Sequence, residues 1–424
     1  MIKANDSNRK SWIEVSKDSD FPIQNIPFGV FKKSDNNICV GTRIGDRAID
    51  LNALQKLNYF AGIALGPEIF NKKTLNDLLK LNKPAWRAVR DRIAEIFDAN
   101  NEMDETHKGL VLSMIEEVEM MMPVSVGDYT DFYSSRQHAY NVGCMFRDPN
   151  NALLPNWLHI PVGYHGRASS IVLSGTNIHR PKGQQLPVDA EMPVFGPCKL
   201  MDFELEMAFV TGQGKELGNH ISTAEADDYI FGMCIFNDWS ARDIQKWEYV
   251  PLGPFLGKNF ASSISPWIVT LDALEPFRVE GEKQEPAVLP YLEFKGNKNI
   301  DIKLEVQIAS DHFEPHTISR SNYKYMYWNM TQQLAHHTIN GCNINAGDLM
   351  ASGTISGNTP DAYGSMLELS WKGTKPITMP DGSERKFLQD NDSLIMKAHC
   401  QANHYRIGFG EVRTKILPAK KLNI

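Results

Sequence analysis

The chain has 424 residues, of which 42% are hydrophobic and 22% are charged, a composition typical of a globular protein. Its formal net charge of -7 argues against a nucleic-acid-binding protein, and no basic segment offsets that charge. The first ten residues lack the apolar core of a signal peptide, and no apolar run is long enough to cross a membrane. We therefore expect a cytoplasmic protein with neither a nucleic-acid nor a membrane partner.

The chain is longer than one hydrophobic core usually organises, so we expect two domains. In the first, residues 1–118, short β-like runs at 28–31, 38–40 and 48–51 are broken by Gly and Asn and predict a small barrel. A helical segment is predicted after it, starting near Pro84. Its apolar residues recur at spacings of three and four, at Trp86, Val89, Ile93 and Phe97. Chemistry-bearing residues do not cluster here, which indicates a scaffold.

The second domain is predicted to span residues 119–424. Glycines and prolines separate short strand-like runs, among them 292–308, 393–402 and 414–417, and the best helix candidate is 325–338. This pattern favours a large, mostly antiparallel β architecture. The six cysteines form no Cys-x-x-Cys pair and are interpreted as reduced, small core residues rather than a disulfide set or a zinc site.

The segment 202–209 predicts one strand with an acidic face. Side chains alternate along a strand, so Asp202, Glu204 and Glu206 share one face and four apolar residues share the other. Like charges on one face repel, and this face therefore needs either open water or a cation. A solvated acidic face is the simpler interpretation of this segment alone. A hard divalent cation held by carboxylates is the alternative.

Other segments carry matching chemistry. Asp131 precedes His138 by seven residues in a turn-prone segment, where a carboxylate could bind a metal and an imidazole could transfer a proton. A lone histidine is more often structural. Arginine and tyrosine then alternate with glycine and could bind a small carboxylate, or be structural, at Arg147, Tyr164, His165 and Arg167.

The densest block is 237–249. Asp238 follows an apolar run and is expected at a strand end. If a helix starts after it, Arg242 and Gln245 share one face, and Lys258 follows on a glycine-flanked loop. These donors could stabilise a developing oxyanion. Further on, 351–357 predicts a tight turn, and Glu368 is expected among apolar strand neighbours, buried and paired with a group such as His138.

These segments resemble the fumarylacetoacetase family. The resemblance is carried in chain order by residues 127–138, 156–167, 202–209, 237–258, 352–357 and 365–374. The first domain is similar to the family more loosely, through residues 20–29. The resemblance implies a mainly β fold, with a small N-terminal SH3-like barrel and a large C-terminal β-roll that carries catalysis. It also implies a homodimer.

The activity implied is hydrolysis of a carbon–carbon bond of 4-fumarylacetoacetate, a diketo acid, to fumarate and acetoacetate, the last step of tyrosine and phenylalanine catabolism. The implied cofactor is Ca²⁺ or Mg²⁺. The family's metal ligands fall on Asp131, Glu204, Glu206 and Asp238, and a second magnesium site falls on Asp238, Lys258 and Ser262. Asp202 is not a ligand in the family.

The resemblance also assigns catalytic and binding roles. The water-activating base falls on His138, supported by Glu368, and the oxyanion group falls on Arg242, Gln245 and Lys258. The family's substrate contacts fall on Tyr133, Arg147, Tyr164, Tyr249 and Thr354. The alternatives are another enzyme of the superfamily, such as an acylpyruvate hydrolase or oxaloacetate decarboxylase, and a metal-stabilised binding protein without catalysis.

Overall fold

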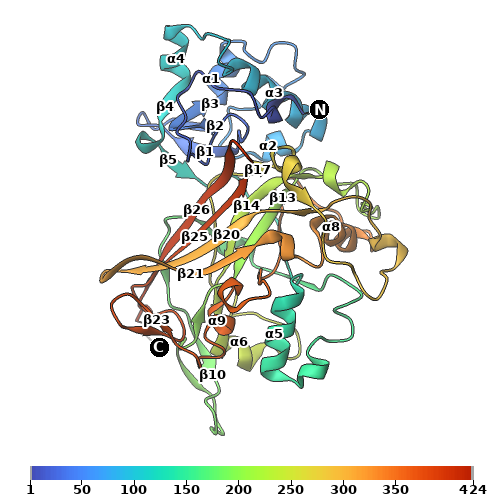
Figure 1. Ribbon diagram of the computed structural model, residues 1–424, viewed down its shortest axis with the longest axis vertical. Coiled ribbons are helices and arrows are strands. Elements are labelled where there is room, and N and C mark those ends of the chain that lie inside the picture. The colour runs from blue at the N-terminus through green and yellow to red at the C-terminus, as the bar shows by residue number, and fades with distance from the viewer. Residues whose placement is uncertain (1, 422–424) are drawn as a thin grey trace.

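The structure is a computed structural model that describes residues 2–421. It is built mostly from β-strands in two parts, as the sequence predicts, with a smaller N-terminal part stacked on one end of a larger β-rich part (Figure 1). The predicted fold class is confirmed. No helix within the described range has the length and apolar character needed to cross a bilayer. All six cysteines are free thiols.

The N-terminal part contains a five-stranded antiparallel sheet, in the order β4 (Leu112–Met114), β3 (Arg47–Asp50), β2 (Ile38–Ile44), β1 (Phe28–Lys32) and β5 (Glu119–Met121). Its helices are α1 (Leu51–Lys56), α2 (Asn76–Leu79), α3 (Lys83–Ile96) and α4 (Glu105–Val111). The predicted helix near Pro84 is α3. It begins there because the Asn82 side chain accepts a hydrogen bond from the Ala85 amide and Pro84 fits the first turn.

The larger part is organised around a mixed sheet. Its strand order is β7 (Gly163–His165), β6 (Tyr129–Phe132), β22 (Leu349–Ala351), β13 (Leu205–Thr211), β14 (Ile230–Asp238), β16 (Ser262–Ile264) and β8 (Ile171–Leu173), and β17 (Val269–Thr270) also pairs with β14. The β22–β6 and β16–β8 pairs are parallel. The strands β13 and β14 are buried along their whole length, so both faces of the sheet are covered.

A second sheet covers one face. Its order is β21 (Phe313–Asn322), β20 (Lys303–Ser310), β25 (Ser393–Gln401), β26 (Arg406–Leu417) and β9 (Ile178–His179). Met207 of β13 and Ile235 of β14 share a core with Val306 of β20 and Met396 of β25. The remaining paired strands are β10 (Lys182–Gln185) with β11 (Val194–Pro197), β12 (Met201–Asp202) with β15 (Ser240–Ala241), β18 (Arg278–Val279) with β19 (Asn299–Ile300), and β23 (Ile377–Thr378) with β24 (Glu384–Arg385).

The N-terminal part covers the opposite face of the mixed sheet. Ala208 and Phe236 belong to the same core as Phe28 and Val89. Phe28 also exchanges both backbone hydrogen bonds with Ile268, at 2.8 Å each. The two parts therefore form one continuous packed body.

Helices and loops complete the larger part. The helices are α5 (Arg136–Phe146), α6 (Arg242–Glu248), α7 (Leu271–Leu274), α8 (Met330–Thr338) and α9 (Met366–Leu369). The helix predicted over 325–338 starts only at Met330, because Asn329 caps it. The strand predicted over 292–308 is instead a turn, a loop and the strands β19 and β20, since Gly296 adopts a φ of 76° in between.

Candidate active site and metal centre

Three carboxylates converge on one face of the mixed sheet. Asp131 lies on β6, Glu206 on β13 and Asp238 at the end of β14, and one oxygen of each lies within 4.8 Å of the others. All three residues are buried. Within residues 2–421, no other three His, Cys, Asp or Glu side chains converge in this way. The structure therefore brings together three of the four predicted metal ligands.

The triad has oxygen atoms free to bind a cation. Tyr129 Oη donates to Asp131 Oδ2 at 2.6 Å, and the Gly353 amide donates to Glu206 Oε2 at 2.9 Å. Asp131 Oδ1 and Glu206 Oε1 are buried and have no hydrogen-bond partner among the described residues. Buried oxygens without a donor are costly, so these two atoms fit the coordination of a cation.

The electrostatics agree with a cation. Burial raises the pKa of Asp131 well above its ordinary range, and the nearby Asp238 carboxylate raises it further. Burial also raises the pKa of Glu206 well above its ordinary range, and the Asp131 charge raises it further. Carboxylates packed this closely must either take up protons or surround a positive ion. Their oxygen ligands fit a hard divalent cation, so this acidic triad can hold a metal.

Glu204, the fourth predicted ligand, lies outside the triad. Its Oε1 pairs with Nη1 of Arg242 at 2.8 Å and its Oε2 with Nζ of Lys258 at 2.6 Å. Burial alone would raise the pKa of Glu204, but the charges of Lys258 and Arg242 outweigh burial and lower it. The prediction of one continuous strand over 202–209 was wrong, because β12 ends at Asp202 and β13 begins at Leu205.

Lys258 also reaches the triad. Its Nζ lies 2.7 Å from Asp238 Oδ2, and Ser262 Oγ donates to Asp238 Oδ1 at 3.1 Å. The register of β14 with β16 explains the second contact, because Asp238 lies directly opposite Ser262. The three residues predicted for a second magnesium site therefore meet around one carboxylate.

A buried histidine–carboxylate pair forms the second half of the site. His138 Nδ1 lies 2.7 Å from Glu368 Oε2, and their side chains are 4% and 0% exposed. His138 lies in the first turn of α5, which Ser135 caps. The sequence prediction that Glu368 lies among strand neighbours was wrong. It lies on the four-residue helix α9, capped by Ser365, which is too short to show a helical period.

Sequence reasoning missed the groups that hold Glu368. Asn141 Nδ2 donates to its Oε1 at 2.8 Å, Ser356 Oγ donates at 2.9 Å and Ser365 Oγ donates to its Oε2 at 2.8 Å. Burial alone would raise the pKa of Glu368, but His138, Asn141 and Ser365 outweigh burial and lower it. Asn141 could have been found, because it follows His138 by three residues and shares a helical face with it.

The predicted helix after Asp238 is α6. Arg242 and Gln245 lie one turn apart, with Nη1 of the arginine 3.4 Å from Oε1 of the glutamine. Gly257 packs against Gln245, where a Cβ would lie 2.7 Å from the glutamine's own Cβ. With Lys258, the three predicted oxyanion donors therefore come from one continuous segment.

Of the five predicted substrate contacts, Tyr133 and Tyr164 lie against residues of the site. The Tyr133 ring lies 5.2 Å from the His138 ring, and Tyr164 Oη donates to Asp238 Oδ2 at 2.8 Å. Thr354 Oγ1 is buried and has no partner among the described residues. By contrast, Arg147 donates to the carbonyl of Ala152, and Tyr249 is 51% exposed at the end of α6.

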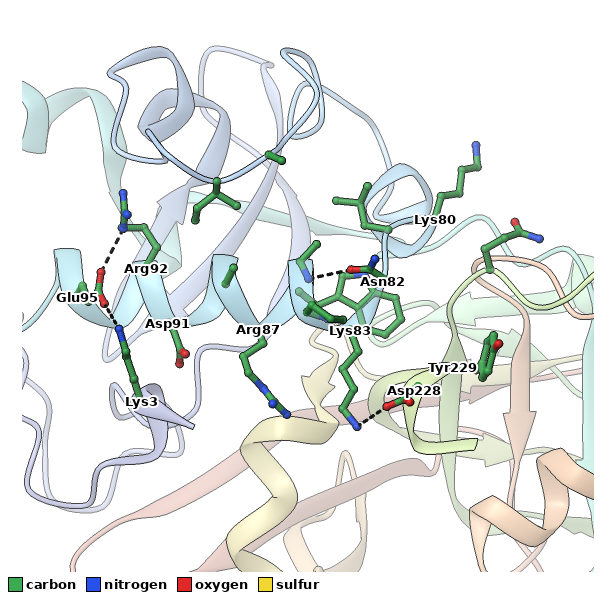
Figure 2. Close-up of a pocket in the computed structure, with 18 residues that line it drawn as sticks. Lys3, Lys80, Asn82, Lys83, Arg87, Asp91, Arg92, Glu95, Asp228 and Tyr229 are labelled. Carbon is green, nitrogen blue, oxygen red and sulfur yellow. Dashed lines mark hydrogen bonds and ion pairs between the residues drawn. The ribbon is translucent and has the colours of Figure 1, made fainter. Parts of the chain in front are cut away.

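A large cavity lies away from these residues. It has a volume of about 1270 Å³ and lies along α3, where the N-terminal part meets loops of the larger part (Figure 2). Some of its charged side chains pair with one another, as Lys83 does with Asp228 and Arg92 with Glu95. None of the predicted site residues lines it.

Comparison with known proteins agrees with this geometry. The family described as fumarylacetoacetate (FAA) hydrolase C-terminal matches residues 129–417, and fumarylacetoacetase N-terminal matches residues 24–123. Fumarylacetoacetases from Dictyostelium discoideum and Homo sapiens are each 52% identical to this chain. The match to the Dictyostelium discoideum protein covers 97% of this chain and 99% of the relative. The match to the Homo sapiens protein covers 96% of this chain and 99% of the relative. The Arabidopsis thaliana fumarylacetoacetase is 49% identical, over 97% of this chain and 99% of its own.

Solved structures support the fold. The fumarylacetoacetate hydrolase from psychrophilic Exiguobacterium antarcticum superposes with a TM-score of 0.53 at 16% identity, over 93% of this chain and 100% of its own. The structure of Cg1458 with inhibitor superposes with a TM-score of 0.52 at 14% identity, over 93% of this chain and 100% of its own. At these identities the likeness concerns the fold alone. The family matches and the near-full-length identity establish that this chain belongs to the fumarylacetoacetase family.

Proposed function

We propose that this protein hydrolyses the carbon–carbon bond of 4-fumarylacetoacetate to fumarate and acetoacetate, the last step of tyrosine and phenylalanine catabolism. The observation that carries the proposal is the buried His138–Glu368 pair, in a site that also holds the triad of Asp131, Glu206 and Asp238. Relatives that bear the name fumarylacetoacetase are 52% identical over nearly the whole chain. A base and a cation site in one buried region suit hydrolysis of a diketo acid.

For the metal, we propose Ca²⁺ or Mg²⁺ held by Asp131, Glu204, Glu206 and Asp238. The unpartnered oxygens of Asp131 and Glu206 support this assignment. Glu204 would join the set by exchanging one of its present ion pairs for the cation. A bound divalent cation supplies polarisation of the substrate's keto oxygens. A second magnesium site is proposed at Asp238, Lys258 and Ser262. The Asp238 carboxylate and the Ser262 hydroxyl, whose oxygens lie 3.1 Å apart, support it, and Lys258 would contribute its backbone carbonyl because its ammonium has no lone pair.

The chain's own residues account for proton transfer. The Glu368 carboxylate holds Nδ1 of His138, which leaves Nε2 to accept a proton from water. The water attacks the carbonyl carbon next to the bond that breaks. Arg242, Gln245 and Lys258 then donate to the alkoxide that develops, a contribution of roughly 3 kcal/mol for a well-placed donor. Bond cleavage releases acetoacetate as its enolate, which takes up a proton.

Substrate contacts are proposed at Tyr133, Arg147, Tyr164, Tyr249 and Thr354. The buried Thr354 hydroxyl without a partner supports its inclusion, because a ligand oxygen would satisfy it. The exposed Tyr249 side chain would become covered when substrate binds.

The competing functions are less well supported. An acylpyruvate hydrolase or oxaloacetate decarboxylase would share the acids but does not account for the N-terminal family match over 24–123. A metal-stabilised binding protein needs no base, so the His138–Glu368 pair counts against it. Turnover of fumarylacetoacetate, an acylpyruvate and oxaloacetate should be compared at equal enzyme concentration. Faster turnover of either rival substrate would contradict the proposal.

We also propose a homodimer formed chiefly through the second domain and a cytoplasmic location. The boundary predicted between 1–118 and 119–424 is proposed a few residues later, because β5 (Glu119–Met121) pairs with β1 in the N-terminal sheet. The family match over residues 129–417 and the size of the second domain support the homodimer, and the six free thiols suit a reducing compartment. Sizing with light scattering tests the assembly, since a protein that elutes with the mass of one chain of 47.8 kDa would contradict it.

A further inference from the structure

Asp202 is buried between two catalytic segments and has no role in the proposed chemistry. Its carboxylate is fully buried. It lies at the end of β12, directly opposite Ser240 of β15, and α6 begins two residues after Ser240. This register places the carboxylate at the start of the helix that carries Arg242.

The two oxygens of Asp202 accept hydrogen bonds from both segments. Oδ2 accepts from Nε of Arg242 at 2.8 Å and from the amide of Leu367 at 3.1 Å, and Oδ1 accepts from the amide of Met366 at 2.7 Å. Met366 and Leu367 open α9, the helix that carries Glu368. One carboxylate therefore ties the arginine of the oxyanion group to the helix that orients the base.

The hydrogen bonds of Arg242 show what this tie does. Nε is held by Asp202 and Nη1 by Glu204, at 2.8 Å each, whereas Nη2 is buried and has no partner among the described residues. A guanidinium is planar, so fixing Nε and Nη1 fixes the direction of the N–H groups on Nη2. A preorganised donor that lacks a protein partner is what oxyanion stabilisation requires.

We propose that Asp202 is a positioning residue, which orients Arg242 so that Nη2 faces the developing oxyanion and which keeps Arg242 in register with the His138–Glu368 pair. The proposal rests on the proposed function, because it assigns Nη2 to that reaction's alkoxide. Asp202 does not touch the substrate. It acts through the plane of the guanidinium and through the start of α9.

The test is a double-variant cycle on fumarylacetoacetate with Asp202→Asn, Arg242→Gln and both changes together. An amide at 202 keeps the shape but loses the charge and turns a donor toward Nε. We expect kcat to fall about 10- to 100-fold in Asp202→Asn, with KM changing less than about 3-fold and metal content unchanged. The double variant should be no slower than Arg242→Gln alone.

Several outcomes would overturn the proposal. These are wild-type kcat in Asp202→Asn, multiplicative losses in the double variant, or a loss that follows metal content. If Asp202→Asn fails to fold, the role is tested with Arg242→Lys instead. A lysine ammonium can pair with Glu204 but cannot also offer a fixed third nitrogen. Full kcat in Arg242→Lys would then contradict the role. A wild-type enzyme that does not turn over fumarylacetoacetate would instead refute the proposed function.

Discussion

The Nδ1 atom of His138 and the Oε2 atom of Glu368 lie 2.7 Å apart, although 230 residues separate them in the chain. Removing the base should therefore remove most of the catalysis. His138→Ala is expected to lower kcat by about 10²- to 10⁴-fold, with metal content unchanged. Glu368→Gln should lower kcat more than it raises KM, because the amide cannot stabilise an imidazolium in the same way.

The double variant tests whether the pair acts as a unit. His138→Ala with Glu368→Gln should be little slower than His138→Ala alone, since Glu368 works through the imidazole. Turnover under saturating substrate is the measurement for all three variants. Fully multiplicative losses would mean that the two residues act separately.

The triad predicts a metal-dependent enzyme. Glu206→Gln should lose bound divalent metal and activity together, since it removes one of three converging carboxylates. A cation at about 100 times its Kd adds about 2.7 kcal/mol to the free energy of unfolding, so chelation should also lower the melting temperature. Glu314→Gln, an exposed change on β21, is the control. Full activity after exhaustive chelation would contradict the metal's role.

Gly353 should be intolerant of a side chain for a local reason. Its φ is 76°, an added Cβ would lie 2.2 Å from the carbonyl oxygen of Phe132, and its amide donates to Glu206. Gly353→Ala should therefore lower both the melting temperature and the metal affinity. Gly382→Ala has a similar φ of 81° but open space around it, and should cost only about 1 kcal/mol of strain. Equal effects of the two changes would contradict this account.

The sequence predicted the parts of the fold and of the site that depend on local spacing. Helix α3 followed from its apolar period and from Pro84 in its first turn, and Glu206 shares its face with Ala208 as strand alternation requires. The break between β12 and β13 could not be predicted, because it depends on pairing with β15, β14 and β22. Asp202 and Glu204 looked equivalent in sequence, yet Asp202 binds the start of α9 and Glu204 binds Lys258.

Two of the three supports of Glu368 are tertiary in origin. Asn141 and Ser356 reach it from separate segments, whereas Ser365 lies three residues before it and caps the same helix. The spacing of Asn141 from His138 and the Ser-x-x-Glu pattern at Ser365 carry local signals, but Ser356 has none. Which hydroxyl of a glycine-rich turn meets a distant carboxylate depends on how the sheets pack. That information is not contained in any short stretch of the chain.

A half-buried histidine makes the fold sensitive to acid. His337 lies beside His165 and Asp128 in a cavity of about 170 Å³. Burial, aided by the charge of His165, lowers the pKa of His337 to about 4. The unfolded chain, with a histidine pKa of about 6.5, binds that proton first. The free energy of unfolding should therefore fall as the pH drops from about 6.5 to about 4, by up to about 3 kcal/mol from this residue.

Urea unfolding of the wild type and of His337→Gln at about pH 7 and about pH 4.5 measures this contribution. The variant should lose less free energy of unfolding on acidification than the wild type does. His312→Gln, an exposed change, should behave as the wild type. An identical pH dependence in His337→Gln would show that another group controls acid unfolding.

The most direct test of the account is hydrolysis of fumarylacetoacetate in ¹⁸O-labelled water. The purified protein, with its divalent metal, should remove the substrate's absorbance and release equal amounts of fumarate and acetoacetate. Attack of water on the fumaroyl carbonyl places one ¹⁸O in the new carboxylate of fumarate and requires no label in the carboxylate of acetoacetate. His138→Ala should release neither product at a comparable rate. Loss of substrate without these two products, or undiminished turnover by His138→Ala, would contradict the account.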